Sequence, residues 1–157
     1  MGDAIGTRPP TTPVVVELPE QYAAVVFIDG AVDELPKLMG EAFRLTAEAI
    51  AASGAQIAGH PFARYVGFGQ RVQAEVGFPY VGRLTATDRV HDAILPAGRA
   101  VTTRHVGAYD TIAGAWNRAA AWMREHELVP SGPAWECYLT GPDEPGLPVT
   151  EVFWPLD

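Results

Sequence analysis

The sequence of 157 residues contains few of the residues on which catalytic and metal centres most often depend. Its one cysteine, Cys137, excludes an internal disulfide and fits a reducing compartment. The 4 histidines show no His-x-x-x-His spacing, so we expect neither a metal nor any other cofactor. The serines, Ser53 and Ser131, fall at an expected helix end and in an expected loop, which disfavours serine catalysis.

Basic residues and long apolar runs are also scarce. The 11 lysines and arginines are scattered among 19 acidic residues, and the net charge of −8 disfavours nucleic-acid binding, which needs a basic surface. No apolar run approaches the roughly 18 residues of a membrane span, and no signal-peptide pattern is present. We therefore expect a soluble cytoplasmic protein without a membrane or nucleic-acid partner.

The composition is that of a globular domain, with 48% hydrophobic and 19% charged residues. Residues 1–11 are mostly Gly, Pro, Thr and Asp and predict a flexible tail, so residues 12–157 are expected to form a single domain. Apolar residues at helical spacing predict helices over about 33–53 and 110–127. β-enriched segments predict strands at 14–18, 22–28, 63–68, 72–80, 99–106, 133–139 and 149–155, and residues 81–97 predict a linker with one short strand.

This order of elements repeats, and so do several residues. Gly30 is matched by Gly107 in the second half of the chain, and Tyr65 is matched by Tyr138. A Glu-Val-x-x-Pro motif at 75–79 recurs at 151–155. The spacing between the two members is nearly the same in all three cases. This near-constant offset indicates a duplication, with half-modules at about 12–80 and 98–157.

The repeat predicts an α+β fold of two strand-helix-strand-strand modules. Their strands would form one antiparallel sheet with both helices on one face and a ligand groove on the other. The seam between the modules is the expected position of the groove, because binding sites favour such interfaces.

One carboxylate interrupts the expected strand at 133–139. Because side chains alternate along a strand, Glu136 and Tyr138 share one face, while Trp135 and Cys137 share the other, which we expect to be the core side. On that side Cys137 would behave as a small apolar residue and not as a nucleophile. Arg64 lies near the position equivalent to Glu136 in the first half, where it could form a salt bridge or line the rim of the groove.

Four motifs in this order resemble those of the GyrI-like small-molecule-binding domain family. They are Glu75-Val76-Gly77-Phe78-Pro79, Leu95-Pro96-Ala97-Gly98, His105-Val106-Gly107-Ala108-Tyr109-Asp110 and Pro133-x-Trp135-Glu136-x-Tyr138-Leu139. The same fold forms the effector-binding part of many multidrug-responsive transcription regulators. This sequence has no helix-turn-helix segment, so the resemblance does not extend to a regulator that acts alone.

The resemblance implies a pocket of aromatic residues with an acidic residue at its floor, which falls on Glu136. Its expected ligand is a small hydrophobic and cationic aromatic compound, bound for sequestration or sensing. The expected ligand-binding residues are Glu136, Tyr138, Tyr109, Tyr65, Phe68, Tyr80, Trp116 and Trp154.

An enzyme is the alternative. Some free-standing members of the family resemble hydrolases that open strained cyclopropane rings of DNA-alkylating natural products. In that case Glu136 would activate water with the assistance of Tyr109 or Tyr138. The sequence does not separate the binding protein from the hydrolase, and it does not decide between a monomer and a homodimer.

Overall fold

A computed structural model describes residues 12–67, 69–108, 111–140 and 144–157. The chain forms β1 (Val14–Leu18), β2 (Gln21–Gly30), a 3-10 turn (Val32–Glu34), α1 (Leu35–Ala52), β3 (Gln56–Ile57), β4 (Phe62–Gly67) and β5 (Val72–Val81). It continues with β6 (Val90–Leu95), β7 (Gly98–Val106), α2 (Ala113–Glu125), β8 (Trp135–Tyr138) and β9 (Val149–Pro155). The predicted tail at 1–11 lies outside the described residues.

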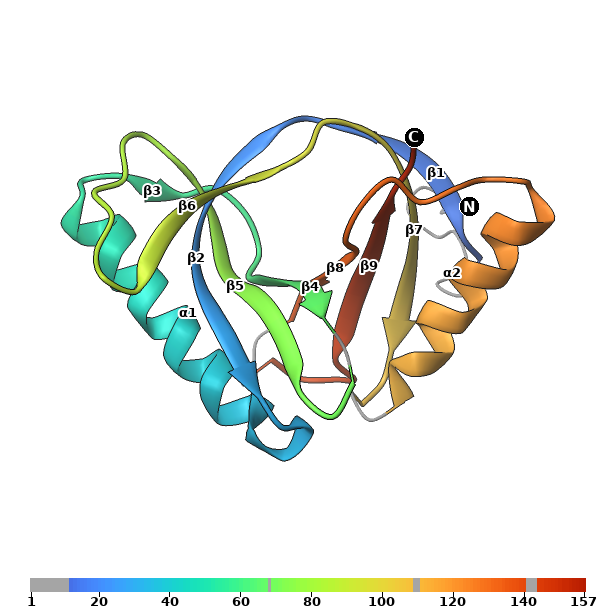
Figure 1. Cartoon of the computed structure of the whole chain (residues 1–157), viewed down its shortest axis with the longest axis horizontal. Helices are drawn as coiled ribbons and strands as arrows, with labels where there is room; N and C mark the ends of the chain where they lie inside the picture. Colours follow the sequence, from blue (N-terminus) through green and yellow to red (C-terminus); the bar gives the residue numbers. More distant parts are fainter. Residues whose placement is uncertain (1–11, 68, 109–110, 141–143) are drawn as a thin grey trace.

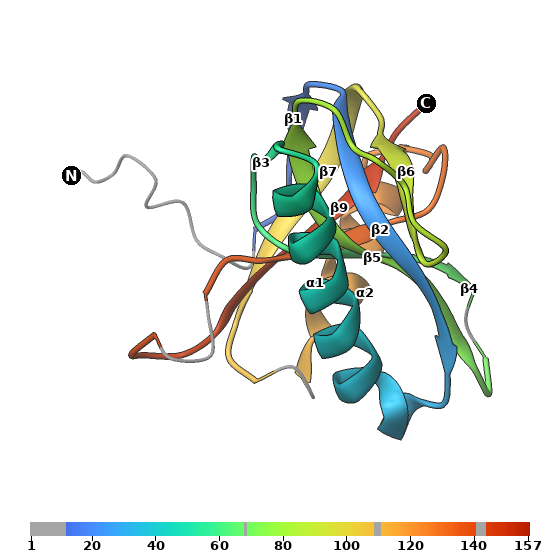
Figure 2. The ribbon, with the colours of Figure 1, turned by 90° about the vertical axis from the view of Figure 1, so that its left-hand side faces the viewer.

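The strands form one antiparallel sheet in the order β1-β7-β9-β8-β4-β5-β2-β6, with β3 added to the end of β5. Figure 1 shows α1 and α2 flanking the sheet on either side of the short strands β4 and β8. Figure 2, turned by 90°, shows α1 lying alongside β2 and β5. The predicted α+β fold with two helices is therefore confirmed. Neither helix in the described part of the chain is long and apolar enough to cross a membrane.

Local sequence fixes the ends of α1. Ahead of the helix, the Glu34 carboxylate accepts a hydrogen bond from the backbone N–H of Ala31 at 2.8 Å. At the other end Gly54 adopts a φ of 75°, and the next backbone N–H, of Ala55, bonds to the carbonyl of Ile50. The helix end expected at Ser53 is therefore present.

The two halves repeat the same strand register. Val26 of β2 pairs with Val76 of β5, and their counterparts in the second half, Thr103 and Val152, pair in β7 and β9. The agreement extends to strands far apart in the sheet and supports the duplication.

The first strands of the two halves are exchanged. In β1, Val14 pairs with Thr102 of β7, and the counterpart of Val14 in β6, His91, pairs with Val25 of β2. Each half thus lends its first strand to the outer edge of the other. The repeat extends upstream of residue 98 to include β6, which lies within the segment expected to be mainly a linker.

A pseudo-twofold axis passes between β4 and β8. Ala63 pairs with Glu136 across this seam, and these two residues are each other's counterparts, because their sequence separation equals that of Tyr65 and Tyr138. At this pair of equivalent positions beside the axis, the first half therefore carries alanine and the second half carries glutamate. The seam is symmetric in its backbone and asymmetric in its charge.

Both faces of the sheet carry apolar clusters. On the helix-bearing face, β2, β4 and β5 pack against α1, while Val101 of β7 packs against Ala119 and Met123 of α2. On the opposite face, Phe62 and Trp135 form a separate cluster that Leu18, Ala93, Leu95, Cys137 and Phe153 extend. Because two cores share one sheet, its central strands are apolar on both sides.

Candidate functional site

Glu136 lies near the centre of the sheet, on the short strand β8. Its neighbours in the same cross-strand row are Ala63 on β4 and Val152 on β9, which are 0% and 1% exposed. Glu136 itself is only 5% exposed. A carboxylate in such surroundings loses most of its hydration, and hydrogen-bond donors must replace the lost water.

Three aromatic side chains supply these donors. The hydroxyls of Tyr138 and Tyr65 donate to Oε1 of Glu136 at 2.9 and 3.1 Å. The indole Nε1 of Trp116, on α2, donates to Oε2 at 2.7 Å. The donors come from β8, β4 and α2, so elements of both halves fix the orientation of one carboxylate.

The two tyrosines are repeat counterparts, and their hydroxyl oxygens lie 3.4 Å apart. Burial raises the pKa of Tyr138 well above its usual value of 10.0, and the negative charge of Glu136 and the neighbouring Tyr65 raise it further. Tyr138 therefore stays protonated at neutral pH and remains a donor. The symmetric pair of hydroxyls converges on a single oxygen of the asymmetric carboxylate.

Aromatic rings continue on both sides of Glu136. On the α1 side, Phe43 makes edge-to-face contacts with Tyr138 and Phe78, at centroid distances of 6.1 and 5.8 Å. On the α2 side, Trp116 makes a similar contact with Trp154 of β9 at 5.5 Å. All of these rings are half-buried, so the cluster keeps aromatic surface in contact with solvent.

The structure brings most of the sequence-predicted residues together. Trp154 joins the cluster through its contact with Trp116, and the hydrogen-bonded group around Glu136 contains Tyr65, Trp116 and Tyr138. Tyr80 differs, because its hydroxyl donates to Asp92 on the edge strand β6. Phe68 and Tyr109 lie outside the described residues, so their predicted roles stay predictions.

One expectation about position needs correction. We expected the groove on the face opposite the helices, but the contacts of Glu136 with Trp116 of α2 place the carboxylate on the helix-bearing face. Arg64 forms one of the two interactions expected of it, a salt bridge, and its partner is Glu75. It pairs in register with Trp135, and its side chain binds Glu75, so it points to the other face. The true counterpart of Glu136 is Ala63, one residue earlier, and one residue along a strand reverses the face.

Sequence reasoning missed the contribution of Phe43 and left Phe78 out of the expected ligand-binding residues. Phe43 lies on the apolar side of α1, where a phenylalanine is indistinguishable from an ordinary core residue. The repeat carried no signal for it, because the equivalent position of the second half is occupied by Ala120. Only the packing of α1 against β5 and β8 shows that Phe43 contacts Tyr138.

Cys137, next to Glu136 in sequence, points to the other face. It packs against the cluster that contains Phe62 and Trp135, and it lines a hollow of about 210 Å³ there. Burial raises the pKa of its thiol to about 12, with further contributions from Glu151 and Glu136. The side chain is therefore a thiol at neutral pH, in agreement with its expected apolar role.

We expect iodoacetamide to alkylate Cys137 in the folded protein at pH 8 at least about tenfold more slowly than a free cysteine. The reason is that the raised pKa leaves almost no thiolate. Mass spectrometry of timed samples measures the rate, and the denatured protein serves as the control because its thiol is exposed. Alkylation of the native chain at the denatured rate would contradict the burial described here.

Within the described ranges, no three His, Cys, Asp or Glu side chains converge as metal ligands would. The arrangement around Glu136 is instead an anion held by neutral donors and surrounded by rings. Such a site can bind a cation or an aromatic compound, or it can orient a polar group of a ligand.

A family model matches nearly the whole chain. The GyrI-like small-molecule-binding domain matches residues 11–157. The chain belongs to this family. It is therefore a small-molecule-binding domain, and the likeness of its sequence motifs to that family is confirmed. Among curated proteins, none matches the sequence significantly.

Solved structures share the GyrI-like fold. The C-terminal domain of EcmrR superposes with a TM-score of 0.80 at 16% identity, covering 93% of this chain and 97% of that one. A hydrolase from Listeria innocua gives 0.69 at 15% identity, with 96% and 94% covered. SAV2435 bound to tetraphenylphosphonium gives 0.64 at 10% identity, with 93% and 94% covered. At these identities the similarities concern the fold alone.

Proposed function

We propose that this domain binds small hydrophobic cations at the seam between its halves and that Glu136 supplies the opposing charge. The observation that carries the proposal is the missing counterion. No lysine, arginine or histidine of the described residues lies within 4.0 Å of the Glu136 carboxylate, whose three donors are neutral. A buried carboxylate without a cationic partner is costly, and a cationic ligand removes that cost.

The surrounding rings favour a cation with an apolar body. Phe43 and Phe78 lie on the α1 side, and Trp116 and Trp154 lie on the α2 side. Each ring face that meets a cation contributes about 0.5–2 kcal/mol, with Trp the strongest. Because three donors already occupy most of the acceptor positions of Glu136, a cation with delocalised charge and no N–H group suits this site. The tetraphenylphosphonium bound to SAV2435 is a cation of that kind.

Hydrolysis is the alternative. A carboxylate has about four acceptor positions, and Glu136 uses three of them. One position on Oε2 remains for a water molecule, and the hydrolase from Listeria innocua shows that an enzyme can have this fold. A base that activates water is expected to be more open to its substrate than Glu136, so the geometry favours binding.

A matched pair of ligands tests the proposal. Calorimetric titration with 1-methylquinolinium and with 1-methylnaphthalene compares compounds of nearly equal shape that differ in charge. We expect the cation to bind at least about tenfold more tightly, because only the cation gains the attraction of Glu136 and of the ring faces. Equal affinities would show that the seam recognises shape alone and would refute the assigned charge role.

A further inference from the structure

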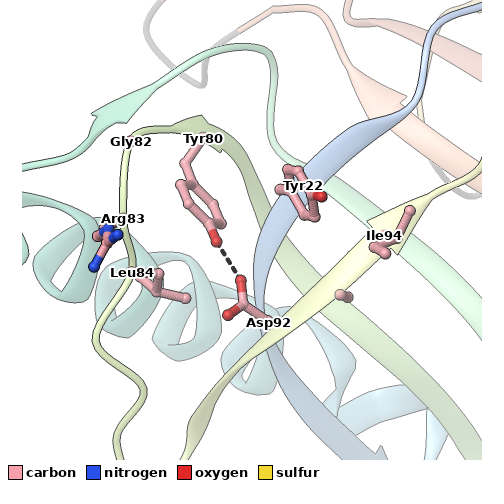
Figure 3. A pocket seen from close by; sticks show the side chains of 8 residues that line it. Tyr22, Tyr80, Gly82, Arg83, Leu84, Asp92 and Ile94 are labelled. Carbon is pink, nitrogen blue, oxygen red and sulfur yellow. Dashed lines mark hydrogen bonds between the residues drawn. The ribbon is translucent and has the colours of Figure 1, made fainter.

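A second hollow lies at the outer edge of the first half, away from Glu136. It has a volume of about 450 Å³ and lies between β2, β6 and the segment that follows β5. Figure 3 shows its main side chains, and none of the donors to Glu136 is among its lining residues. The volume is within the range of small-molecule sites, which is roughly 300–1,000 Å³.

The polar centre of the hollow is a tyrosine–aspartate pair. Tyr80 is 7% exposed, and its hydroxyl donates to Oδ1 of Asp92, as the dashed line in Figure 3 shows. Burial, together with the bond to Asp92, raises the pKa of Tyr80 to about 12, so Tyr80 remains a donor at neutral pH. Asp92 is exposed, and its Oδ2 has no partner among the described residues. Among the described residues, no lysine, arginine or histidine forms an ion pair with Asp92.

Apolar surface adjoins the free carboxylate oxygen. Tyr22 and Ile94 pair across β2 and β6 and are 54% and 46% exposed. In Figure 3 they lie on one side of Asp92, while Leu84 and Arg83 lie on the other. The hollow therefore offers one anion and an aromatic–aliphatic surface beside it.

The second half shows that the fold does not need this polar pair. By the register of the repeat, the counterpart of Tyr80 is Leu156, and the counterpart of Asp92 is Val15. Leu156 is buried, and Val15 occupies the same place in the register of the opposite edge. The equivalent backbone of the second half therefore forms with an apolar residue at both positions. The tyrosine, the aspartate and the surface beside them are a local feature of the first half.

We propose that this hollow is a second small-molecule site, which takes a primary or secondary ammonium group carried on an aromatic or aliphatic body. Asp92 Oδ2 accepts a hydrogen bond from an N–H of the ammonium group, and Tyr22 and Ile94 cover the apolar body. Arg83 on the opposite rim disfavours dications. The ligand class differs from that of the seam, because Asp92 is open to N–H donors whereas Glu136 is already covered by three of its own.

Titrating the full ¹⁵N-labelled chain with tryptamine and following the backbone amides by NMR tests the proposal. We expect saturable shifts in β6 and in residues 82–84, and affinity on the order of tenfold weaker for indole-3-ethanol, which replaces the ammonium by a hydroxyl. Asp92→Asn should weaken tryptamine binding by a similar factor. The double variant Tyr80→Leu, Asp92→Val copies the other half, so it should fold and lose the site.

Glu136→Gln separates this site from the seam. It should leave the tryptamine shifts in β6 unchanged, and these shifts should persist even if 1-methylquinolinium fails to bind at the seam. Tryptamine shifts that survive Asp92→Asn, or that vanish in Glu136→Gln, would overturn the proposal. Equal affinity for tryptamine and indole-3-ethanol would overturn it as well, since the ammonium group would then have no role.

Discussion

Replacing Glu136 by glutamine should weaken the binding of 1-methylquinolinium by about thirtyfold or more. Glutamine keeps the size of the side chain and one acceptor oxygen but removes the charge. The amide nitrogen would also confront either the Trp116 indole or the tyrosine hydroxyls, which now donate to the carboxylate. The cation therefore loses its counter-charge in surroundings with little water, where charge interactions are strongest. Calorimetry of the two proteins side by side gives the ratio.

Tyr138→Phe is the matched control for this variant. It removes one donor at 2.9 Å and keeps both the ring and the charge of Glu136, so we expect only a severalfold loss of cation affinity. Equal affinity of wild type and Glu136→Gln for the cation would refute the proposed role of Glu136 as its counter-charge. Turnover of a cyclopropane-containing alkylating compound by wild type, absent in Glu136→Gln, would instead identify the domain as a hydrolase.

The sequence predicted the elements of the fold because their apolar patterns are regular. It also predicted the duplication. The strand register now adds further equivalent positions to the repeat, because the pairs Val26–Val76 and Thr103–Val152 correspond. The segment with β6 was harder to interpret. His91 and Asp92 interrupt its apolar pattern, because an edge strand is half exposed and pairs on one side only.

The candidate site was predictable in part. Strand alternation placed Glu136 and Tyr138 on one face, and the repeat supplied Tyr65. Alternation cannot tell which face the helices cover, and here both faces bury apolar residues, so the face expected for Glu136 was wrong. The contacts of Phe43 and Trp116 depend on how each helix is rotated and docked, which a single sequence does not reveal.

The asymmetry at the axis has a physical reason. The twofold relation brings residue 63 directly opposite residue 136 in adjacent strands. Two carboxylates at these positions would repel each other in surroundings with few water molecules, and one of them would have to take up a proton. Alanine at position 63 avoids this conflict and leaves both tyrosine hydroxyls to one carboxylate. The duplicated seam therefore carries a single acidic residue at its axis.

Gly77 is the position where we expect a single methyl group to cost the most stability. A Cβ atom built there would lie 1.8 Å from the carbonyl oxygen of Ala24 and 2.9 Å from its carbon. Both are backbone atoms of the neighbouring strand β2, so the clash can be relieved only by displacing the strands. We expect Gly77→Ala to lower the free energy of unfolding by about 3 kcal/mol or more. Urea denaturation followed by circular dichroism measures the change.

Gly40→Ala is the matched control. Gly40 lies in α1, is exposed, and has no atom within 4 Å of the position that a Cβ would occupy. The same substitution should therefore stabilise the protein by about 0.5–1 kcal/mol through helix propensity. A Gly77→Ala protein whose stability lies within about 0.5 kcal/mol of wild type would show that β2 and β5 separate easily.

The close approach at Gly77 is particular to the first half of the chain. Its counterpart in β9 is Phe153, which stacks on Trp135 on the face opposite the helices. In the first half, Thr46 of α1 lies 3.1 Å from the position that a Cβ of Gly77 would occupy. A methyl group there would therefore press on α1 as well as on β2, and the tight packing of α1 onto β5 is expected to depend on Gly77.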